Sequence, residues 1–216
     1  MILVENMSKI KGHGQKTQVV EPNEDEDEKK IFTYDINAGS RAVLRIVQTE
    51  VNKLNDNLIK TVKDNVGPLD YKTNVKALMT KWNLSNRYVD RLHQIIKEHL
   101  PQELENEKWV SHLNFFETWG AIYKHQDYAT PHSHWPCTWS WIYYAQIDDK
   151  SSPLILYNIV ENDSTKISNM QLRPRTGQLV MFPSYVIHGV DKTGGIGEDQ
   201  WRIVLAGNIM LEHEKK

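Results

Sequence analysis

Residues 131–147 read PHSHWPCTWSWIYYAQI, and they combine a strong strand signal with the most closely spaced pair of histidines in the chain. From Thr138 to Ile147 aromatic and β-branched residues predominate, which is typical of a β-strand. Alternation along this strand places Trp139 and Trp141 on one face and Tyr144 on the other. We expect most of these rings to lie in the core of a β-sheet protein.

Similar runs occur on both sides of this stretch and alternate with turn signals. They span Trp109–Phe116, Trp119–Tyr123, Leu154–Ile159, Gln178–Phe182 and Arg202–Met210. No helical pattern separates these runs, so the sheets are expected to be mostly antiparallel. So many strand runs in roughly a hundred residues indicate a sandwich or a jelly roll.

The residues before this β-rich part have a helical pattern. Six apolar residues spaced by one, three and four predict a first helix: Val43, Leu44, Val47, Val51, Leu54 and Leu58. A second helix is predicted over 74–82. A third is predicted from Ser85, as its N-cap, to Pro101. We expect the helices to cover one outer face of the sheet, with His93 and His99 at the surface or at an edge.

The chain is divided by composition into three parts. Residues 1–30 are polar, and six of the ten residues at 21–30 are acidic, which predicts a disordered or surface acidic arm. A helical layer is expected over 31–108 and a β-rich core over 109–216. The layer and the core are expected to form one compact domain.

Composition excludes several classes of protein. The 216 residues are 39% hydrophobic and 25% charged, which is typical of a globular protein, and no apolar run is long enough to span a membrane. The single cysteine, Cys137, allows neither an internal disulfide nor a cysteine-based zinc site, and it is expected to be a small buried hydrophobe in a reduced, cytoplasmic setting. A net charge of −2 gives no reason to expect nucleic acid as a partner. Nothing in the sequence indicates the oligomeric state.

Three histidines and one arginine form a candidate site. In an extended strand His132 and His134 project from the same face, so both imidazoles can reach one point. His188 and then Arg202 follow at the ends of later strand runs. Imidazole is a good ligand for first-row metals such as iron, zinc, copper and nickel. Alone, however, an H-x-H pair is a weak signal that chance or packing also explains.

Three segments together carry a more specific resemblance. They are Tyr123–His134, the segment PRTGQLVMFPS at 174–184 with the His188 that follows it, and Arg202. With them, the region 109–209 resembles the Fe(II)/2-oxoglutarate-dependent dioxygenase superfamily, and within it a branch of bacteriophages and marine bacteria that carries H-x-H. The resemblance implies a mainly β fold, a double-stranded β-helix or jelly-roll barrel like that of cupins.

The resemblance also implies roles for individual residues. It makes His132 and His188 ligands of Fe(II), and Arg202 the partner of the far carboxylate of 2-oxoglutarate, which a planar guanidinium can hold by two parallel hydrogen bonds. Tyr123 occupies the place of a tyrosine that helps to bind this co-substrate in prolyl-hydroxylase-like members. Two asparagines are weaker candidates for the same pocket: Asn208 and Asn114.

One position departs from the family pattern. The usual metal site has two histidines and one carboxylate, and here His134 stands where the carboxylate is expected. His134 is a third metal ligand, or it lies beside a water that completes the site, or the site is inactive or binds another metal. His125 and Asp127 either orient an imidazole or are exposed loop residues.

The function expected from these features is that of an oxygenase. It would use Fe(II), 2-oxoglutarate and O2 to hydroxylate or otherwise oxidise a small-molecule or peptide substrate, with release of succinate and CO2. It would act in the cytoplasm, that of the host if a phage encodes it. Two alternatives remain: a cupin-type oxygenase with three histidines and no 2-oxoglutarate, and a barrel that binds metal without catalysis.

Overall fold

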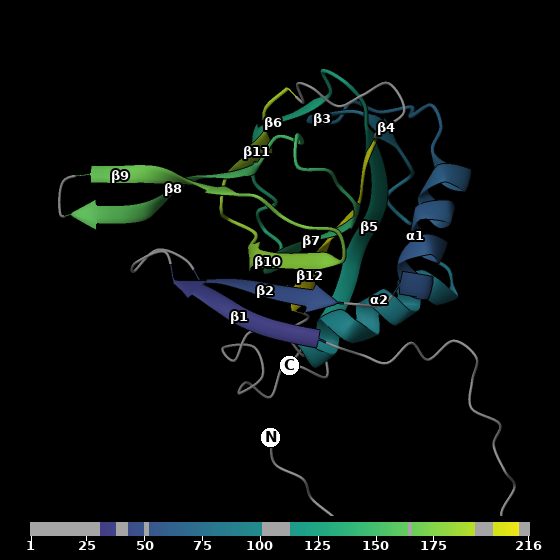
Figure 1. Cartoon of the computed structure of the whole chain (residues 1–216), viewed down its shortest axis with the longest axis horizontal. Coiled ribbons are helices and arrows are strands. Elements are labelled where there is room, and N and C mark those ends of the chain that lie inside the picture. Colours follow the sequence, from purple (N-terminus) through teal and green to yellow (C-terminus); the bar gives the residue numbers. More distant parts are fainter. Residues whose placement is uncertain are drawn as a thin grey trace, which may run out of the picture.

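Two antiparallel sheets form the body of the molecule, and two helices cover the larger one (Figure 1). The structure is a computed structural model that describes residues 31–37, 43–49, 52–100, 113–163, 166–192 and 201–211. The larger sheet has the order β1-β2-β10-β7-β12-β5-β4 and the smaller sheet the order β3-β6-β11-β8-β9. This is the jelly-roll fold expected from the sequence, although the two sheets do not close into a barrel.

The strands of the larger sheet include the longest in the described residues. They are β1 (Ile31–Asn37), β2 (Val43–Thr49), β4 (Leu78–Met79), β5 (Leu113–Tyr123), β7 (Trp139–Gln146), β10 (Gln178–Pro183) and β12 (Arg202–Leu211). The smaller sheet consists of β3 (Val75–Lys76), β6 (Tyr128–His132), β8 (Leu154–Asp163), β9 (Lys166–Leu172) and β11 (His188–Val190). Strands β8 and β9 form a hairpin that projects from the body (Figure 1).

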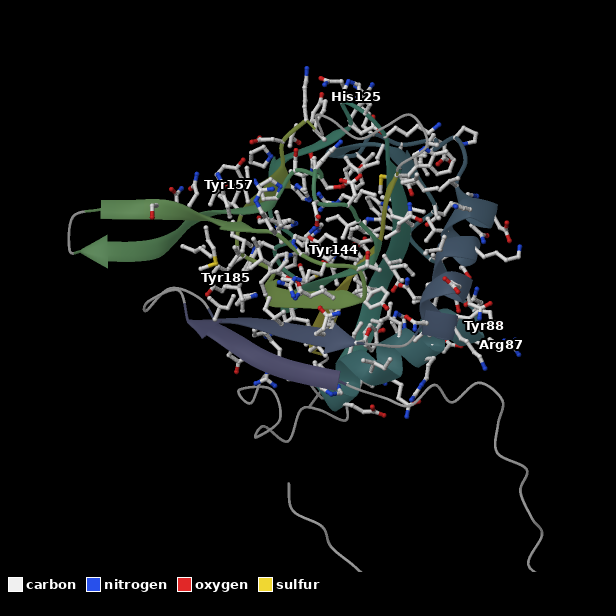
Figure 2. The ribbon with its side chains drawn as sticks, in the orientation of Figure 1. Arg87, Tyr88, His125, Tyr144, Tyr157 and Tyr185 are labelled. Atoms are coloured by element: carbon white, nitrogen blue, oxygen red, sulfur yellow. The ribbon has the colours of Figure 1, made fainter. Side chains whose placement is uncertain are left out.

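The core has two apolar layers, one on each face of the larger sheet. Trp139 and Trp141 of β7 pack toward the helices, whereas Tyr144 of the same strand packs toward the smaller sheet. This alternation is the one predicted from the sequence. Tyr144 is fully buried, and its side chain lies near the middle of the molecule (Figure 2).

Two helices, α1 (Asn52–Asn65) and α2 (Arg87–Glu98), bury their apolar faces on the outer layer. The N-cap of α2 is Asn86, one residue after the predicted Ser85, and its side-chain oxygen accepts hydrogen bonds from the backbone N–H groups of Tyr88 and Val89. No helix among the described residues is long and apolar enough to cross a membrane.

The prediction of a helix from residue 43 is wrong for its first half, because Val43–Thr49 is strand β2 between β1 and β10. Leu44 and Ile46 face the layer between the sheets, and Val47 faces the helices. A strand that is buried on both faces has apolar residues at irregular spacings, and these imitate a helical stripe.

The helix predicted over 74–82 is also wrong. This segment forms two short edge strands, of which β3 pairs with β6 and β4 pairs with β5. The segment therefore forms backbone hydrogen bonds with strands of both sheets. These tertiary contacts outweigh its local preference for a helix. Strand β1, in the part expected to be a helical layer, and strands β6, β9 and β11 were missed, and the two runs at 109–123 belong to one strand that begins at Leu113 within the described residues.

His93 is half-buried. Its ring stacks on that of Phe115 with a centroid distance of 3.9 Å, and its Nε2 lies 3.0 Å from the Thr118 hydroxyl oxygen. The predicted acidic arm at 1–30 lies outside the described residues.

Candidate metal centre and co-substrate cavity

The three candidate histidines lie together at one end of the smaller sheet. His132 is the last residue of β6 and His188 the first residue of β11, and the two residues are direct partners in the antiparallel register. His134 follows β6 in a loop that is held to Ser184 by a backbone hydrogen bond of 2.9 Å. One ring nitrogen from each histidine lies within 4.8 Å of the others, so the three could hold one metal ion.

Backbone carbonyls orient two of these imidazoles. The Nδ1 atom of His132 lies 2.6 Å from the Thr130 carbonyl oxygen, and the Nδ1 atom of His188 lies 3.0 Å from that of Val186. A carbonyl can only accept, so each Nδ1 carries the proton and each Nε2 keeps a free lone pair. This is the state in which an imidazole binds a metal ion.

Burial keeps the cluster uncharged. Desolvation lowers the pKa of His188 to about 3 and that of His134 to about 4, in each case with a smaller contribution from His132. Desolvation also lowers the pKa of His132, against the opposing hydrogen bond to Thr130. Three neutral nitrogen donors at pH 7 are suited to a divalent first-row metal.

A buried arginine lies on the larger sheet beside this cluster. Arg202 begins β12 and is 2% exposed. Its guanidinium donates a hydrogen bond of 2.9 Å to the Ser152 carbonyl and lies over two tyrosine rings, with centroid distances of 5.2 Å to Tyr123 and 5.1 Å to Tyr144. The buried Nε atom of Arg202 has no hydrogen-bond partner.

A buried guanidinium with an unsatisfied nitrogen requires an acceptor, and none of the ion pairs among the described residues includes Arg202. A carboxylate would supply both the charge and the acceptor. Burial raises the pKa of Tyr123 to about 12, although the Arg202 guanidinium lowers it, so the phenol keeps its proton at neutral pH and can donate. The residues therefore fit the far carboxylate of 2-oxoglutarate.

One cavity joins the arginine to the histidines. Its lining includes His132, His134, His188, Tyr123 and Arg202. Its volume of about 40 Å³ gives room for a few water molecules. A dicarboxylate would therefore enter only if lining side chains move.

The pairing of β5 with β12 explains how the site is assembled. Tyr123 is the partner of Arg202, and six residues earlier on β5 Glu117 is the partner of Asn208. Residues at even spacing along a strand share one face. The two strands thus present a series of side chains that runs from the arginine to the far side of the histidine cluster.

Asn208 lies at the histidine end of this series, not among the residues that line the cavity of Arg202. Its amide nitrogen donates to Glu117 Oε2 at 2.9 Å and lies 3.3 Å from His134 Nδ1, and its oxygen accepts from the Ser140 hydroxyl. Glu117 was missed by the sequence analysis. Its even spacing from Tyr123 was the available signal.

The other candidates lie apart from the cluster. Asn114 is exposed near the start of β5 and does not line the cavity. His125 is exposed in the loop after β5 (Figure 2), and the Asp127 carboxylate accepts a hydrogen bond from the backbone N–H of Lys124. Both are therefore loop residues, and the orienting groups are backbone carbonyls. Cys137 is buried, as predicted, and burial raises the pKa of its thiol.

Comparisons with known proteins agree with this geometry. Residues 117–208 match the family model described as "Putative 2OG-Fe(II) oxygenase". No curated protein matches the chain.

Solved structures share the fold at low sequence identity. A prolyl-4-hydroxylase from Pseudomonas putida is 16% identical with a TM-score of 0.56, and the match covers 74% of this chain and 86% of that one. The viral collagen prolyl hydroxylase of Paramecium Bursaria Chlorella virus-1, solved with 2-oxoglutarate, is 13% identical with a TM-score of 0.51 and coverages of 82% and 94%. HygX from Streptomyces hygroscopicus, solved with nickel and 2-oxoglutarate, is 10% identical with a TM-score of 0.54 and coverages of 77% and 82%.

The sequence match and the fold point in the same direction. Residues 117–208 match the "Putative 2OG-Fe(II) oxygenase" model, and the jelly-roll fold is the one that the solved prolyl hydroxylases share with this chain.

Proposed function

We propose that this protein hydroxylates an organic substrate, with His132, His134 and His188 as the ligands of Fe(II) and Arg202 as the partner of 2-oxoglutarate. The bound metal and co-substrate supply the oxidising power: substrate, O2 and 2-oxoglutarate yield hydroxylated substrate, succinate and CO2. One observation carries the proposal. A buried guanidinium with an unsatisfied Nε shares a cavity with three neutral imidazoles.

The residues of the chain bind and orient in this scheme. The carbonyls of Thr130 and Val186 hold two imidazoles with Nε2 available. Arg202 and the protonated Tyr123 hydroxyl bind the far carboxylate, which places the keto acid end toward the histidines. The contact from Arg202 Nη1 to the Ser152 carbonyl can remain when the co-substrate binds, because the Nε of Arg202 has no partner and is available to the carboxylate.

The histidine composition of the site has a chemical consequence. Three neutral ligands leave a bound Fe(II) one negative charge poorer than two histidines and a carboxylate would. The anionic co-substrate restores part of that charge balance when it binds. We therefore expect metal binding to be weak alone and to tighten when 2-oxoglutarate is present.

The direct test is turnover of the co-substrate. Fe(II) and 2-oxoglutarate under air should give succinate and CO2 in equal amounts, slowly without the organic substrate, when ascorbate is added to supply the two electrons that the substrate would otherwise supply. His188→Ala should abolish this release, and Arg202→Leu should raise the 2-oxoglutarate concentration needed by about a hundredfold or more, since a charge-assisted bidentate contact is lost. Oxygen consumption that needs no 2-oxoglutarate and survives Arg202→Leu would instead identify a cupin-type three-histidine oxygenase.

A further inference from the structure

A second, larger cavity adjoins the histidine cluster. It has a volume of about 400 Å³, within the range of small-molecule sites. His132 and His134 form one end of it, and residues of the β3–β4 segment and of β5 form its walls. The same two histidines also line the cavity of Arg202, so the candidate metal centre borders both spaces.

A series of aromatic rings forms one wall of this larger cavity. The Trp119 ring lies 5.7 Å from that of His134, and the Trp82 ring lies 6.3 Å from that of Trp119. Trp82 is 39% exposed and Trp119 is 8% exposed, so the wall leads from solvent to the metal centre. Flat aromatic faces attract organic cations because the ring face is negative.

Glu117 also lines this cavity and is the acidic residue among its walls. Its side chain is half-buried, and its hydrogen bond from Asn208 comes from a neutral amide. None of the ion pairs among the described residues includes Glu117. Lys72, another lining residue, is exposed and does not pair with it. A half-buried carboxylate without a cationic partner is a binding group for a cation.

We propose that this cavity is the substrate site and that it takes an organic molecule with a protonated amine, which Glu117 binds as counter-ion while Trp82 and Trp119 pack against the adjoining carbon atoms. The assignment of the cavity to the substrate rests on the proposed oxygenase function. The ammonium group at Glu117 positions a carbon a few atoms away beside His134 and the metal centre.

The test compares three five-carbon probes with different head groups: n-pentylammonium, n-pentanol and pentanoate. Quenching of tryptophan fluorescence and calorimetric titration report their binding to the full chain, with and without Mn(II) and 2-oxoglutarate. We expect n-pentylammonium to bind at least about tenfold more tightly than pentanol, and pentanoate more weakly than either.

Glu117→Gln should reduce the amine-to-alcohol affinity ratio to near one, and Trp82→Leu should lower it severalfold. The matched control is Glu98→Gln on the exposed face of α2, which should leave the ratio unchanged. The ratio is informative even if a variant loses overall affinity, because a general defect weakens both probes.

The outcomes separate this inference from the oxygenase function. If Mn(II) and 2-oxoglutarate bind but the wild-type protein shows no preference for the amine, or if Glu117→Gln keeps the preference, the substrate class is wrong and the oxygenase function stands. If the amine preference depends on Glu117 but 2-oxoglutarate does not bind even with Mn(II), the cation site stands and its assignment to an oxygenase substrate is overturned.

Discussion

The chemistry of single residues in this protein is governed by burial. The imidazoles at the metal centre and the phenol of Tyr123 are all displaced toward their neutral forms, whereas Arg202 keeps its charge between two aromatic rings. The site therefore combines neutral donors for a metal with one fixed cation for an anion. Outside the site, His93 is also held neutral by burial, which makes stability depend on pH.

His93 provides a prediction on acid stability. Desolvation lowers its pKa in the folded protein to about 4, below the value near 6.5 of an unfolded chain. Between these two values the unfolded state binds more protons, so stability falls as the pH is lowered from about 6.5 to 4. His93→Gln, which can keep a hydrogen bond to Thr118, should show a smaller decrease in Tm between pH 7 and pH 5.

The measurement is thermal unfolding by circular dichroism at each pH, without added metal. The other histidines are common to both proteins, so the difference isolates His93. His125→Gln, in an exposed loop, is the control and should behave like the wild type. An equal pH dependence in His93→Gln and wild type would contradict the buried neutral state.

At the scale of elements, the start of α2 is set by one side chain, that of Asn86, which accepts hydrogen bonds from backbone N–H groups of the first turn. Asn86 accepts from two backbone N–H groups and also donates to the Thr61 hydroxyl of α1. Asn86→Ala should therefore lower the free energy of unfolding by about 1–2 kcal/mol in urea titrations. Ser85→Ala, at the residue that the sequence suggested as the cap, should change it by less than about 0.5 kcal/mol. The reverse order would mean that the helix starts one residue earlier.

The contact of α1 with the larger sheet depends on a glycine. A Cβ atom at Gly120 of β5 would lie 2.5 Å from a methyl carbon of Val62, which is closer than packed atoms approach. Gly120→Ala should destabilise the protein by about 1–3 kcal/mol. In the double variant with Val62→Ala the loss should be smaller than the sum of the single losses, because the truncated valine makes room. Strict additivity in a double-mutant cycle would contradict this contact.

At the scale of the whole molecule, the candidate sites for the metal and for 2-oxoglutarate contain residues from both sheets. His132 and His188 come from strands β6 and β11 of the smaller sheet, and Arg202 and Tyr144 come from strands β12 and β7 of the larger one. A metal and 2-oxoglutarate bound together would therefore link both layers and stabilise the folded state in proportion to their occupancy.

Thermal unfolding should show this linkage. Mn(II) with 2-oxoglutarate, each at about a hundred times its dissociation constant, should raise Tm by about 10–20 °C, and a chelator should reverse the shift. His188→Ala should lose the whole shift. Arg202→Leu should keep the part due to metal and lose the part due to 2-oxoglutarate. A shift by 2-oxoglutarate alone that is insensitive to the chelator would place its binding elsewhere.

The sequence predicted correctly those structural features that residues close together in the chain decide. The faces of β7 follow from alternation alone, because a strand has a period of two and its rings must be buried. The third helix and its end also follow from local spacing. The strands at 43–49 and 75–79 could not be predicted in this way, because the strands with which they pair lie in distant parts of the chain.

The candidate site shows the same division. The order of the histidines and Arg202 along the chain indicated the family chemistry, and the H-x-H spacing placed two imidazoles near one point. Only the tertiary structure sets His188 opposite His132, pairs Tyr123 with Arg202 and brings Glu117 and Asn208 to His134. The physical reason is that side-chain direction is a local property of a strand, whereas register between distant strands is decided by the packing of both faces at once.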